Sequence, residues 1–211
     1  MTVPTPADFS ITACILAGGR GRRLGGADKG LVPLAGKPLI AHCIARIAPQ
    51  VGRVMINANR NFEAYAEFGL EIFPDSGPDS LGPLSGVLSA LRAVSTTHVL
   101  TLPCDSPFIP DDLASRLAQP LRHSGATLSV ARADDRIQPV FALLPASLAG
   151  PLACYLDVSG RRIEPWLREQ QACEVDFGTE SFRFMNINTP EDLATAQTLL
   201  ERGDAQTPPA R

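Results

Sequence analysis

The sequence lacks the features of a membrane protein or of a disulfide-bonded secreted domain. No hydrophobic run approaches the roughly 20 residues that a membrane-spanning helix needs. The 5 cysteines stand singly, without C-x-x-C spacing or a histidine cluster that would indicate zinc, and their number is odd. Residues 1–10 contain no basic segment followed by an apolar one, as a secretory leader does. We therefore expect a cytoplasmic protein with reduced, mostly buried thiols.

The chain also lacks a large excess of charge of either sign. The formal net charge is -3, which argues against general affinity for nucleic acid because such affinity needs a basic surface. The length of 211 residues suits one domain with an ample core, and 45% hydrophobic with 19% charged residues is ordinary for a globular protein. Without an internal repeat or a clear linker, we expect a single domain over residues 11–202 between mobile ends at 1–10 and 203–211.

Short apolar segments alternate with amphipathic ones along the chain, a pattern typical of a doubly wound α/β protein. The predicted strands are Thr12–Leu16, Arg53–Asn57, Glu71–Phe73, His98–Leu102, Thr127–Ala131, Val140–Leu144 and Glu174–Phe177. The clearest predicted helices are Lys37–Ile47, Pro83–Val94, Pro110–Ala118, Arg161–Glu169 and Pro190–Leu200. We expect a mostly parallel, twisted sheet of about seven strands with helices on both faces.

A glycine-rich basic loop follows the first predicted strand. Residues 15–30 read ILAGGRGRRLGGADKG and carry four cations beside one carboxylate: Arg20, Arg22, Arg23, Lys29 and Asp28. Glycines let backbone N–H groups approach a ligand closely, and clustered cations attract phosphates. The loop therefore predicts a site for a nucleoside triphosphate.

Two known phosphate motifs do not fit this loop. The dinucleotide fingerprint needs a third glycine where the chain has Leu24, and the G-x-x-x-x-G-K-[ST] loop needs lysine where the chain has Ala27. A flexible, solvated basic turn is the structural alternative. The position of the glycines directly after a strand, where α/β proteins bind ligands, favours a third kind of phosphate loop.

Polar side chains also follow the other predicted strands, at the edge where a parallel sheet binds its ligands. Asn57 could hydrogen-bond a base or a ribose, and Asp75 could accept two hydrogen bonds from the N1–H and the exocyclic amine of guanine. Asp105 is well placed to hold Mg²⁺, which prefers one or two carboxylates plus substrate phosphates. Each residue has a structural alternative, since Asn and Asp are common in turns and at helix starts.

Further candidates rest on weaker patterns. Gly82 and Gly86 allow close approach of a ligand group, and Arg162 with Asn186 and Asn188 could line the pocket of a second, anionic substrate. Solvated charge and edge-strand polarity explain these residues about as well. The segment from 132 to 138 is polar and predicts a flexible connection.

The order of these motifs resembles that of a known family. The matching segments are Leu16-Ala17-Gly18-Gly19, Arg23-Leu24-Gly25, Lys29, Gly36-Lys37-Pro38-Leu39, Ile56-Asn57-Ala58-Asn59, Asp75, Gly82-Pro83-Leu84-Ser85-Gly86, Pro103-Cys104-Asp105-Ser106-Pro107 and Asn186-Ile187-Asn188-Thr189-Pro190. Over roughly residues 12–200 they are similar to the nucleotidyltransferases with a Rossmann-like fold, and among these to the molybdenum cofactor guanylyltransferases (MobA). One departure is Leu24, where the common pattern has methionine.

The resemblance implies a set of site residues. Nucleotide contacts carry over to Leu16, Ala17, Gly18, Lys29, Asn57, Asp75 and Asp105, with Asp105 also holding Mg²⁺. Positions around the phosphates or the pterin carry over to Gly19, Arg23, Gly82, Gly86, Arg162, Asn186 and Asn188. Lys29, Arg23 and Asp105 are the residues expected to stabilise charge during catalysis.

The resemblance also implies the reaction: transfer of GMP from GTP to the phosphate of molybdopterin or molybdenum cofactor, with release of pyrophosphate. Transient contacts with cofactor-synthesis proteins and with acceptor molybdoenzymes follow from it, and neither nucleic acid nor a membrane is expected as a partner. The alternatives are a CTP-dependent molybdopterin cytidylyltransferase, a sugar-phosphate nucleotidyltransferase and a non-catalytic nucleotide-binding module. Gly18-Gly19 and Asp75 favour GTP, and the presence of both Lys29 and Asp105 argues against the non-catalytic module.

Overall fold

The computed structural model describes residues 9–17, 28–76, 82–158 and 162–202, and a seven-stranded sheet forms its centre. The strands are β1 (Ile11–Leu16), β4 (Arg53–Asn57), β5 (Glu71–Phe73), β6 (His98–Pro103), β7 (Ser129–Ala133), β8 (Arg136–Pro145) and β9 (Cys173–Asp176). They lie in the order β5-β4-β1-β6-β8-β7-β9, and β8 alone runs antiparallel to its neighbours. The predicted fold class, a mostly parallel α/β sheet of about seven strands, is confirmed.

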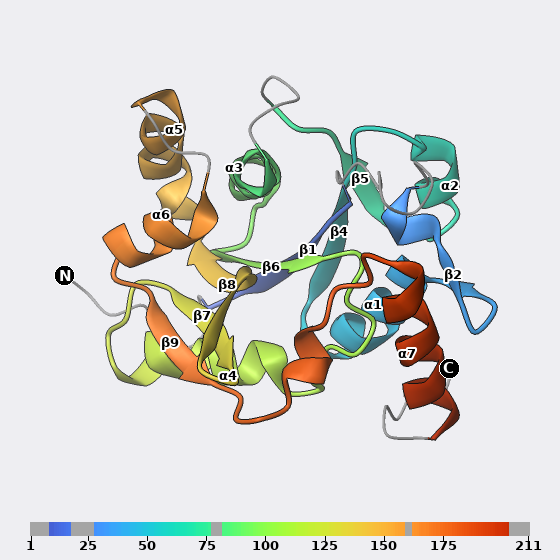
Figure 1. Ribbon diagram of the computed structural model, residues 1–211. Coiled ribbons are helices and arrows are strands. Elements are labelled where there is room, and N and C mark those ends of the chain that lie inside the picture. The colour runs from blue at the N-terminus through green and yellow to red at the C-terminus, as the bar shows by residue number, and fades with distance from the viewer. Residues whose placement is uncertain (1–8, 18–27, 77–81, 159–161, 203–211) are drawn as a thin grey trace.

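Helices cover both faces of the sheet. They are α1 (Leu39–Ile47), α2 (Phe62–Ala66), α3 (Pro83–Ala93), α4 (Leu113–His123), α5 (Ala149–Val158), α6 (Ile163–Glu169) and α7 (Pro190–Glu201). Figure 1 shows α3, α5 and α6 on one face and α1 and α4 on the other. A small hairpin of β2 (Pro33–Leu34) and β3 (Lys37–Pro38) lies against α7. Every described helix is too short or too polar to cross a lipid bilayer.

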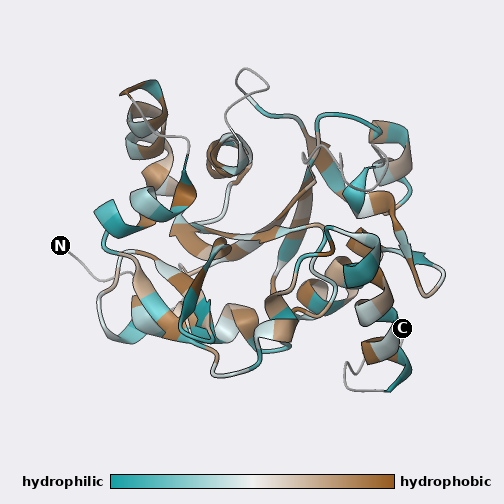
Figure 2. Cartoon of the chain, in the orientation of Figure 1, coloured by the Kyte–Doolittle hydropathy of each residue, from teal (hydrophilic) through white to brown (hydrophobic). Residues whose placement is uncertain are grey.

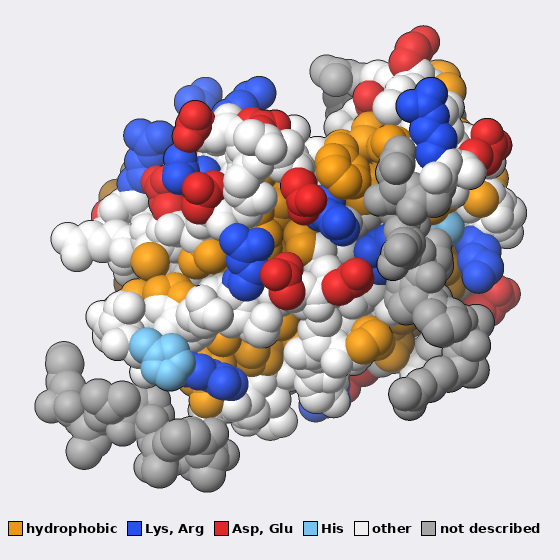
Figure 3. All heavy atoms as spheres, turned by 90° about the horizontal axis from the view of Figure 1, so that it is seen from below, with side chains coloured by type: hydrophobic (Ala, Val, Ile, Leu, Met, Phe, Trp, Pro, Cys, Tyr) orange, Lys and Arg blue, Asp and Glu red, His pale blue; other side chains and the backbone are white. Residues whose placement is uncertain are grey.

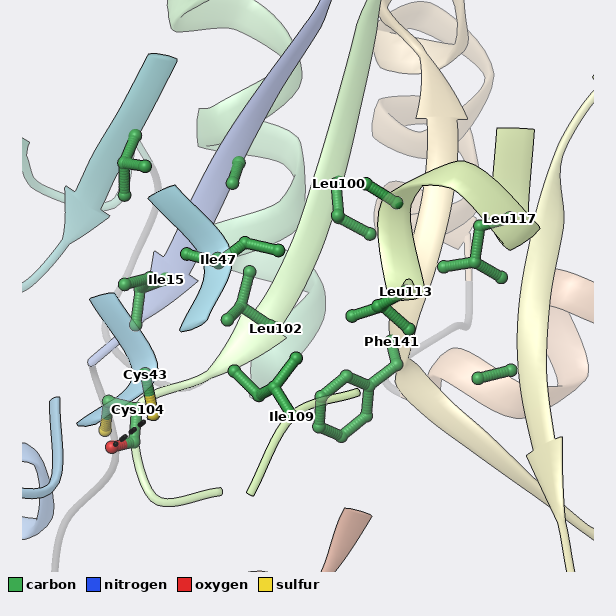
Figure 4. Close-up of a cluster of buried hydrophobic side chains, with 14 of the residues drawn as sticks. Ile15, Cys43, Ile47, Leu100, Leu102, Cys104, Ile109, Leu113, Leu117 and Phe141 are labelled. Atoms are coloured by element: carbon green, nitrogen blue, oxygen red, sulfur yellow. Dashed lines mark hydrogen bonds between the residues drawn. The ribbon is translucent and has the colours of Figure 1, made fainter. Parts of the chain in front are cut away.

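The central strands are buried on both faces, which is why they are nearly continuous apolar runs in the sequence (Figure 2). Alternate residues of β6 point to opposite sides: Leu100 and Leu102 join the apolar cluster under α1 and α4, whereas Val99 joins the cluster under α3 and α6. Figure 4 shows Leu100 and Leu102 packed near Leu113 and Phe141 in the first cluster. These buried layers hold the sheet rigid and leave the ends of its strands to carry polar side chains.

Two expectations about local structure were wrong, one about where a helix begins and one about a polar segment. The first long helix begins at Leu39 rather than at Lys37, because Ala35 and Gly36 adopt left-handed φ values of 49° and 76° and turn the chain into the β2–β3 hairpin. The segment from 132 to 138 is not a flexible connection. It contains the tight β7–β8 turn, in which Asp134 and Asp135 adopt φ values of 48° and 56°. Polarity there reflects an exposed hairpin rather than disorder.

Other boundaries moved by a few residues. The predicted strand Thr127–Ala131 is β7 at Ser129–Ala133, and the predicted helix Pro110–Ala118 is α4 at Leu113–His123. The structure also contains two helices, α2 and α5, that the sequence pattern does not clearly predict. Of the ends expected to be mobile, Ser10 is described and exchanges hydrogen bonds with Thr97, while residues 1–8 and 203–211 lie outside the described residues.

Lys, Arg, Asp and Glu side chains are interspersed on the face that Figure 3 shows. On the β7–β9 edge of the sheet, Arg132 pairs with three carboxylates, those of Asp135 (2.7 Å), Asp176 (3.3 Å) and Glu174 (3.7 Å). Exposed pairs of this kind contribute little stability each.

His98 begins the central strand β6 and has an unusual environment. Its ring is 8% exposed, stacks on Phe9 with centroids 4.2 Å apart, and places Nδ1 2.9 Å from the Thr97 hydroxyl. Burial, together with the smaller effect of the Arg122 charge, lowers the pKa of His98 to about 4. The folded chain therefore holds this imidazole in its neutral form well below its ordinary pKa.

Acid should weaken the fold through His98. Between pH 6.5 and 4 the unfolded chain binds a proton at this residue that the folded chain does not, so the free energy of unfolding falls as the pH falls through this window. In His98→Gln we expect the loss of unfolding free energy between pH 7 and pH 5 to shrink by about 1–2 kcal/mol, measured by urea denaturation. His123→Gln, the same exchange at an exposed position, is the control. Equal pH dependence in wild type and His98→Gln would contradict the assignment.

Candidate active site

Three predicted site residues from distant parts of the chain meet at one point. The ammonium of Lys29 donates a hydrogen bond to Asp105 Oδ2 at 3.1 Å and another to Asn188 Oδ1. Lys29 opens the short 3-10 turn Lys29–Leu31, Asp105 follows the end of β6, and Asn188 precedes α7. The side chains of Lys29 and Asp105 are 20% and 10% exposed, so the ion pair lies mostly out of solvent. The fold thus brings together the basic loop's lysine and the predicted metal-binding carboxylate.

The backbone around Asp105 explains how this meeting arises. Cys104 N–H donates to Leu16 O at 3.2 Å, which extends the pairing of β6 with β1 beyond the last strand residues. Ile187 N–H then donates to Asp105 O at 2.8 Å and fastens the segment before α7 to the same place. Asp105 is therefore held between the sheet and the chain that leads into the last helix.

Asn188 is fixed by the start of α7. Thr189 caps this helix, and Asp192 Oδ2 accepts hydrogen bonds from the backbone N–H groups of Asn188 and Thr189, each at 2.9 Å. Asp192 N–H donates in return to Thr189 Oγ1 at 3.1 Å, which completes a capping box. These bonds lower the pKa of Asp192, the backbone N–H of Asn188 having the largest effect. The cap thereby aims the Asn188 amide at Lys29.

Electrostatics make Asp105 dependent on a cation. Burial raises the pKa of Asp105, and the charge of Lys29 and its hydrogen bond act in the opposite direction. A carboxylate in this position is costly to ionise without a positive partner, since desolvation penalises its charged form. Asp105 is therefore a place where a cation binds favourably.

The residues present fit a magnesium ion that is shared with a substrate. Within the described parts of the chain, no three His, Cys, Asp or Glu residues form a cluster that could hold a metal alone. The carboxylate of Asp105 and the amide oxygen of Asn188 already converge on one cationic group, the Lys29 ammonium. Such hard oxygens suit Mg²⁺, which commonly takes one or two protein carboxylates and completes its coordination with substrate phosphates.

A second polar cluster lies at the ends of β4 and β5. Asn57 Nδ2 donates to Asp75 Oδ1 at 2.9 Å, and Asn59 Nδ2 donates to Asp75 Oδ2 at 3.0 Å. Asn57 is 2% exposed, and a Cβ added to Gly86 of α3 would lie 2.4 Å from its Oδ1. Glycine at 86 is therefore needed for α3 to pack against this amide.

The end of β1 joins the two clusters. Leu16 is paired in register with Asn57 of β4 on one side and with Pro103 of β6 on the other. Ala17, which is fully buried, donates its N–H to Asn57 O at 2.7 Å. Because β4, β1 and β6 are adjacent and parallel, their carboxyl ends place both clusters on one edge of the sheet.

The remaining predicted site residues have varied positions. Gly82 caps α3 with a φ of 69°, a conformation that favours glycine. Asn186 Oδ1 accepts a hydrogen bond from the Ser106 hydroxyl at 2.6 Å, beside Asp105. Arg162 is exposed at the start of α6, a helix that packs against β8, and among the described residues it makes no hydrogen bond or ion pair with Lys29 or Asp105. Gly18, Gly19 and Arg23 lie outside the described residues, as do Arg20 and Arg22.

Asp28 has a different role from the one expected. The sequence pattern places Asp28 among the phosphate-binding charges of the loop, but its side chain is 3% exposed and faces the protein. Its carboxylate accepts hydrogen bonds from Tyr65 Oη (2.6 Å), Asn61 Nδ2 (2.9 Å) and Gly30 N (3.3 Å), and Arg60 Nε lies 3.4 Å away. Asp28 therefore anchors the chain immediately before Lys29. No local pattern links Asp28 with Tyr65, which is 37 residues further along.

The backbone at Asn61 and the absence of a side chain at Gly30 both allow the contacts of Asp28. Asn61 adopts a left-handed φ of 54°, and its amide reaches Asp28 from that conformation. A Cβ added to Gly30 would lie 2.6 Å from Tyr65 Oη, so a side chain at 30 would displace the phenol. The backbone around Lys29 is thus held at several points.

Comparisons with known proteins find relatives over most of this chain. The family model described as "MobA-like NTP transferase domain" matches residues 13–173. A protein of Cupriavidus necator named molybdenum cofactor guanylyltransferase is 47% identical over 193 residues, covering 89% of this chain and 96% of that relative. A Ralstonia nicotianae protein of the same name is 45% identical over 201 residues, covering 91% and 97%. The crystal structure of an Archaeoglobus fulgidus molybdopterin-guanine dinucleotide biosynthesis protein A has the same fold, with a TM-score of 0.74, 24% identity and coverage of 90% and 99%.

The anchor at Asp28 predicts a stability effect. In Tyr65→Phe, the buried carboxylate loses its shortest recorded hydrogen bond, and we expect the free energy of unfolding to fall by about 1–2 kcal/mol. Tyr155→Phe is the matched control, because its hydroxyl donates to Arg162 O at an exposed position and its removal should change stability by less than about 0.5 kcal/mol. Chemical denaturation of both variants measures the difference. Equal stability of Tyr65→Phe and wild type would show that Asp28 does not depend on this phenol.

Proposed function

This chain belongs to the family of MobA-like NTP transferases, and from that premise we propose that it transfers GMP from GTP to the terminal phosphate of molybdopterin or molybdenum cofactor. The products are the guanine dinucleotide form of the cofactor and pyrophosphate. The observation that carries the proposal is the contact of Lys29 with Asp105 on the same sheet edge as Asn57 and Asp75. The name shared by the relatives supports molybdopterin as the acceptor.

The Asp75 carboxylate supports guanine as the base. An ionised carboxylate has about four lone-pair sites, and the recorded amide bonds from Asn57 and Asn59 use one on each oxygen. The free sites can accept the N1–H and the exocyclic N–H of guanine side by side. Cytosine presents one donor group with two acceptors, and the acceptors would face the carboxylate unfavourably. This chemistry favours GTP over CTP.

The phosphates would lie toward Lys29. An oxygen of the acceptor phosphate forms a bond with the α-phosphorus of GTP, and the bond from that phosphorus to the bridging oxygen of the β-phosphate breaks, releasing pyrophosphate. Lys29 is placed to stabilise the negative charge that develops on these oxygens, and Arg23 and the amides of Gly18 and Gly19 are proposed to assist. Mg²⁺ held by Asp105 would supply further charge neutralisation. An acceptor phosphate is already ionised near neutral pH, so no side chain has to remove a proton from it.

The acceptor side of the site is proposed around the start of α7. Asn188 contacts Lys29 and Asn186 contacts Ser106, so both amides border the point where the acceptor phosphate would enter. Gly82 and Arg162 are proposed to contact the acceptor from the starts of α3 and α6. Gly86 lets α3 pack closely against the Asn57 side chain. We also propose a cytoplasmic location and transient contacts with cofactor-synthesis proteins and acceptor molybdoenzymes, since the cofactor has to pass between proteins.

Removal of the Asp105 charge should abolish catalysis. In Asp105→Asn the carboxylate that pairs with Lys29 is lost with little change in shape, and we expect kcat for GMP transfer to fall by about 10³-fold. Asp135→Asn in the β7–β8 turn removes an exposed carboxylate and should retain wild-type turnover. Lys29→Ala should raise KM for GTP and also lower kcat, because Lys29 is proposed both to bind the phosphates and to stabilise the charge that develops on them. Near-normal transfer by Asp105→Asn at saturating Mg²⁺ would place the metal elsewhere.

Nucleotide and acceptor specificity tests the proposed function itself. Pyrophosphate release is measured from GTP, CTP and UTP with molybdopterin and with a sugar phosphate as acceptors. We expect GTP with molybdopterin to exceed every other combination by at least about 100-fold in kcat/KM. Faster release from CTP would identify a cytidylyltransferase, and GTP binding without pyrophosphate release would identify a non-catalytic module.

A further inference from the structure

Asn59 and Asp75 form a two-point contact just beyond the strands that carry them. Asn59 Nδ2 donates to Asp75 Oδ2 at 3.0 Å, and Asp75 N–H donates back to Asn59 Oδ1 at 2.8 Å. The register of β4 with β5 ends at Asn57 and Phe73, so the regular ladder does not reach either residue. The Asn59 side chain therefore supplies Asp75 with hydrogen bonds that hold it in place beyond the end of the sheet.

A second amide holds the other oxygen of the same carboxylate. Asn57 Nδ2 donates to Asp75 Oδ1 at 2.9 Å and lies 3.3 Å from Phe73 O. On the far side of Asp75, Ser76 N–H donates to Ser89 Oγ of α3 at 2.7 Å. The carboxylate is thus oriented by amides from β4 and from the loop that follows it, while α3 holds the backbone just after Asp75.

Among the described residues, the hydrogen-bond donors to the Asp75 carboxylate are the neutral amides of Asn57 and Asn59. Neutral donors orient a carboxylate without cancelling its charge, so the free lone pairs remain strong acceptors for a ligand. The contrast with Asp105 is informative, since that carboxylate faces the Lys29 ammonium. A carboxylate held in this way by the Asn57 and Asn59 amides suits recognition of a neutral ligand group with two adjacent N–H donors.

We propose that Asn59 is a positioning residue that sets selectivity for guanine by holding Asp75 in the orientation that accepts both guanine donors. This inference rests on the proposed function, in which Asp75 receives the base. Of the two amides that hold the carboxylate, that of the buried Asn57 is itself fixed, because α3 packs against it at Gly86. Asn59 supplies the second hydrogen bond, which fixes the orientation of the carboxylate. Without Asn59 the carboxylate keeps one amide contact and can rotate. Rotation weakens binding of guanine, which donates two hydrogen bonds to the carboxylate, more than binding of a base that donates only one.

Equilibrium binding of GTP and of ITP, which lacks the exocyclic amine, measures this selectivity without requiring any transfer reaction. Wild type is expected to bind GTP more tightly than ITP, and Asn59→Ala should reduce the ratio of the two affinities by about tenfold. Asn59→Asp, which keeps the shape but turns the donor into a charged acceptor facing Asp75, should reduce the ratio at least as much. Circular dichroism establishes that each variant is folded.

A matched control and a double-mutant cycle separate positioning from general disruption. Asn61→Gly removes an amide two residues away that contacts Asp28 rather than Asp75, and glycine suits the left-handed φ at 61, so the GTP to ITP ratio should stay at its wild-type value. In an Asp75→Ala background, Asn59→Ala should cause no further change in the ratio. An unchanged ratio in Asn59→Ala alone, or a further tenfold change in the double variant, would overturn the inference.

Pyrophosphate release from GTP is measured in parallel so that the two proposals can fail separately. A wild type that prefers GTP to ITP but transfers no GMP refutes the proposed function, and the binding ratios of the Asn59 variants still decide the role of that residue. A wild type that transfers GMP while Asn59→Ala keeps the wild-type ratio refutes the role of Asn59 alone. A wild type that binds GTP and ITP equally overturns both the base contact of Asp75 and the role of Asn59.

Discussion

The buried carboxylate of Asp105 is the constraint on which the rest of the site depends. Its burial disfavours the ionised form, so the fold has to supply a cation, and Lys29 provides one at 3.1 Å. That contact requires β6 to end beside β1, the Asp28 anchor to hold the chain before Lys29, and α7 to present Asn188. In the proposed function, this pair, assembled from distant parts of the chain, is where the phosphates and a metal ion bind.

In the proposed function, the two clusters on this edge recognise different parts of the nucleotide. Asp105 is paired with a charged ammonium and suits phosphates with a divalent cation, whereas Asp75 is held by neutral amides and suits a base that donates two hydrogen bonds. The end of β1 lies between them and fixes their separation through its register with β4 and β6. The rigid sheet therefore sets the distance between base and phosphates, which is what alignment of a group transfer requires.

The sequence predicted the sheet because its buried strands are short apolar runs, and it predicted the site edge because polar residues such as Asn57 and Asp105 follow those runs. It also predicted that Lys29 and Asp105 belong together. The roles of Asp28 and Asn59 were missed, because each depends on a side chain that another segment brings into contact, Tyr65 for Asp28 and Asp75 for Asn59. The sequence predicts a flexible connection where the structure has the β7–β8 hairpin, because Asp134 and Asp135 carry no periodicity to distinguish a tight turn from a loop.

A crystal structure with Mg²⁺ and a non-hydrolysable GTP analogue would show whether Lys29 and Asp105 share the triphosphate. We expect the metal within about 2.1 Å of an Asp105 oxygen, Lys29 on the triphosphate and the guanine edge on Asp75. A triphosphate bound away from Lys29 and Asp105, or a base that points away from Asp75, would contradict this expectation.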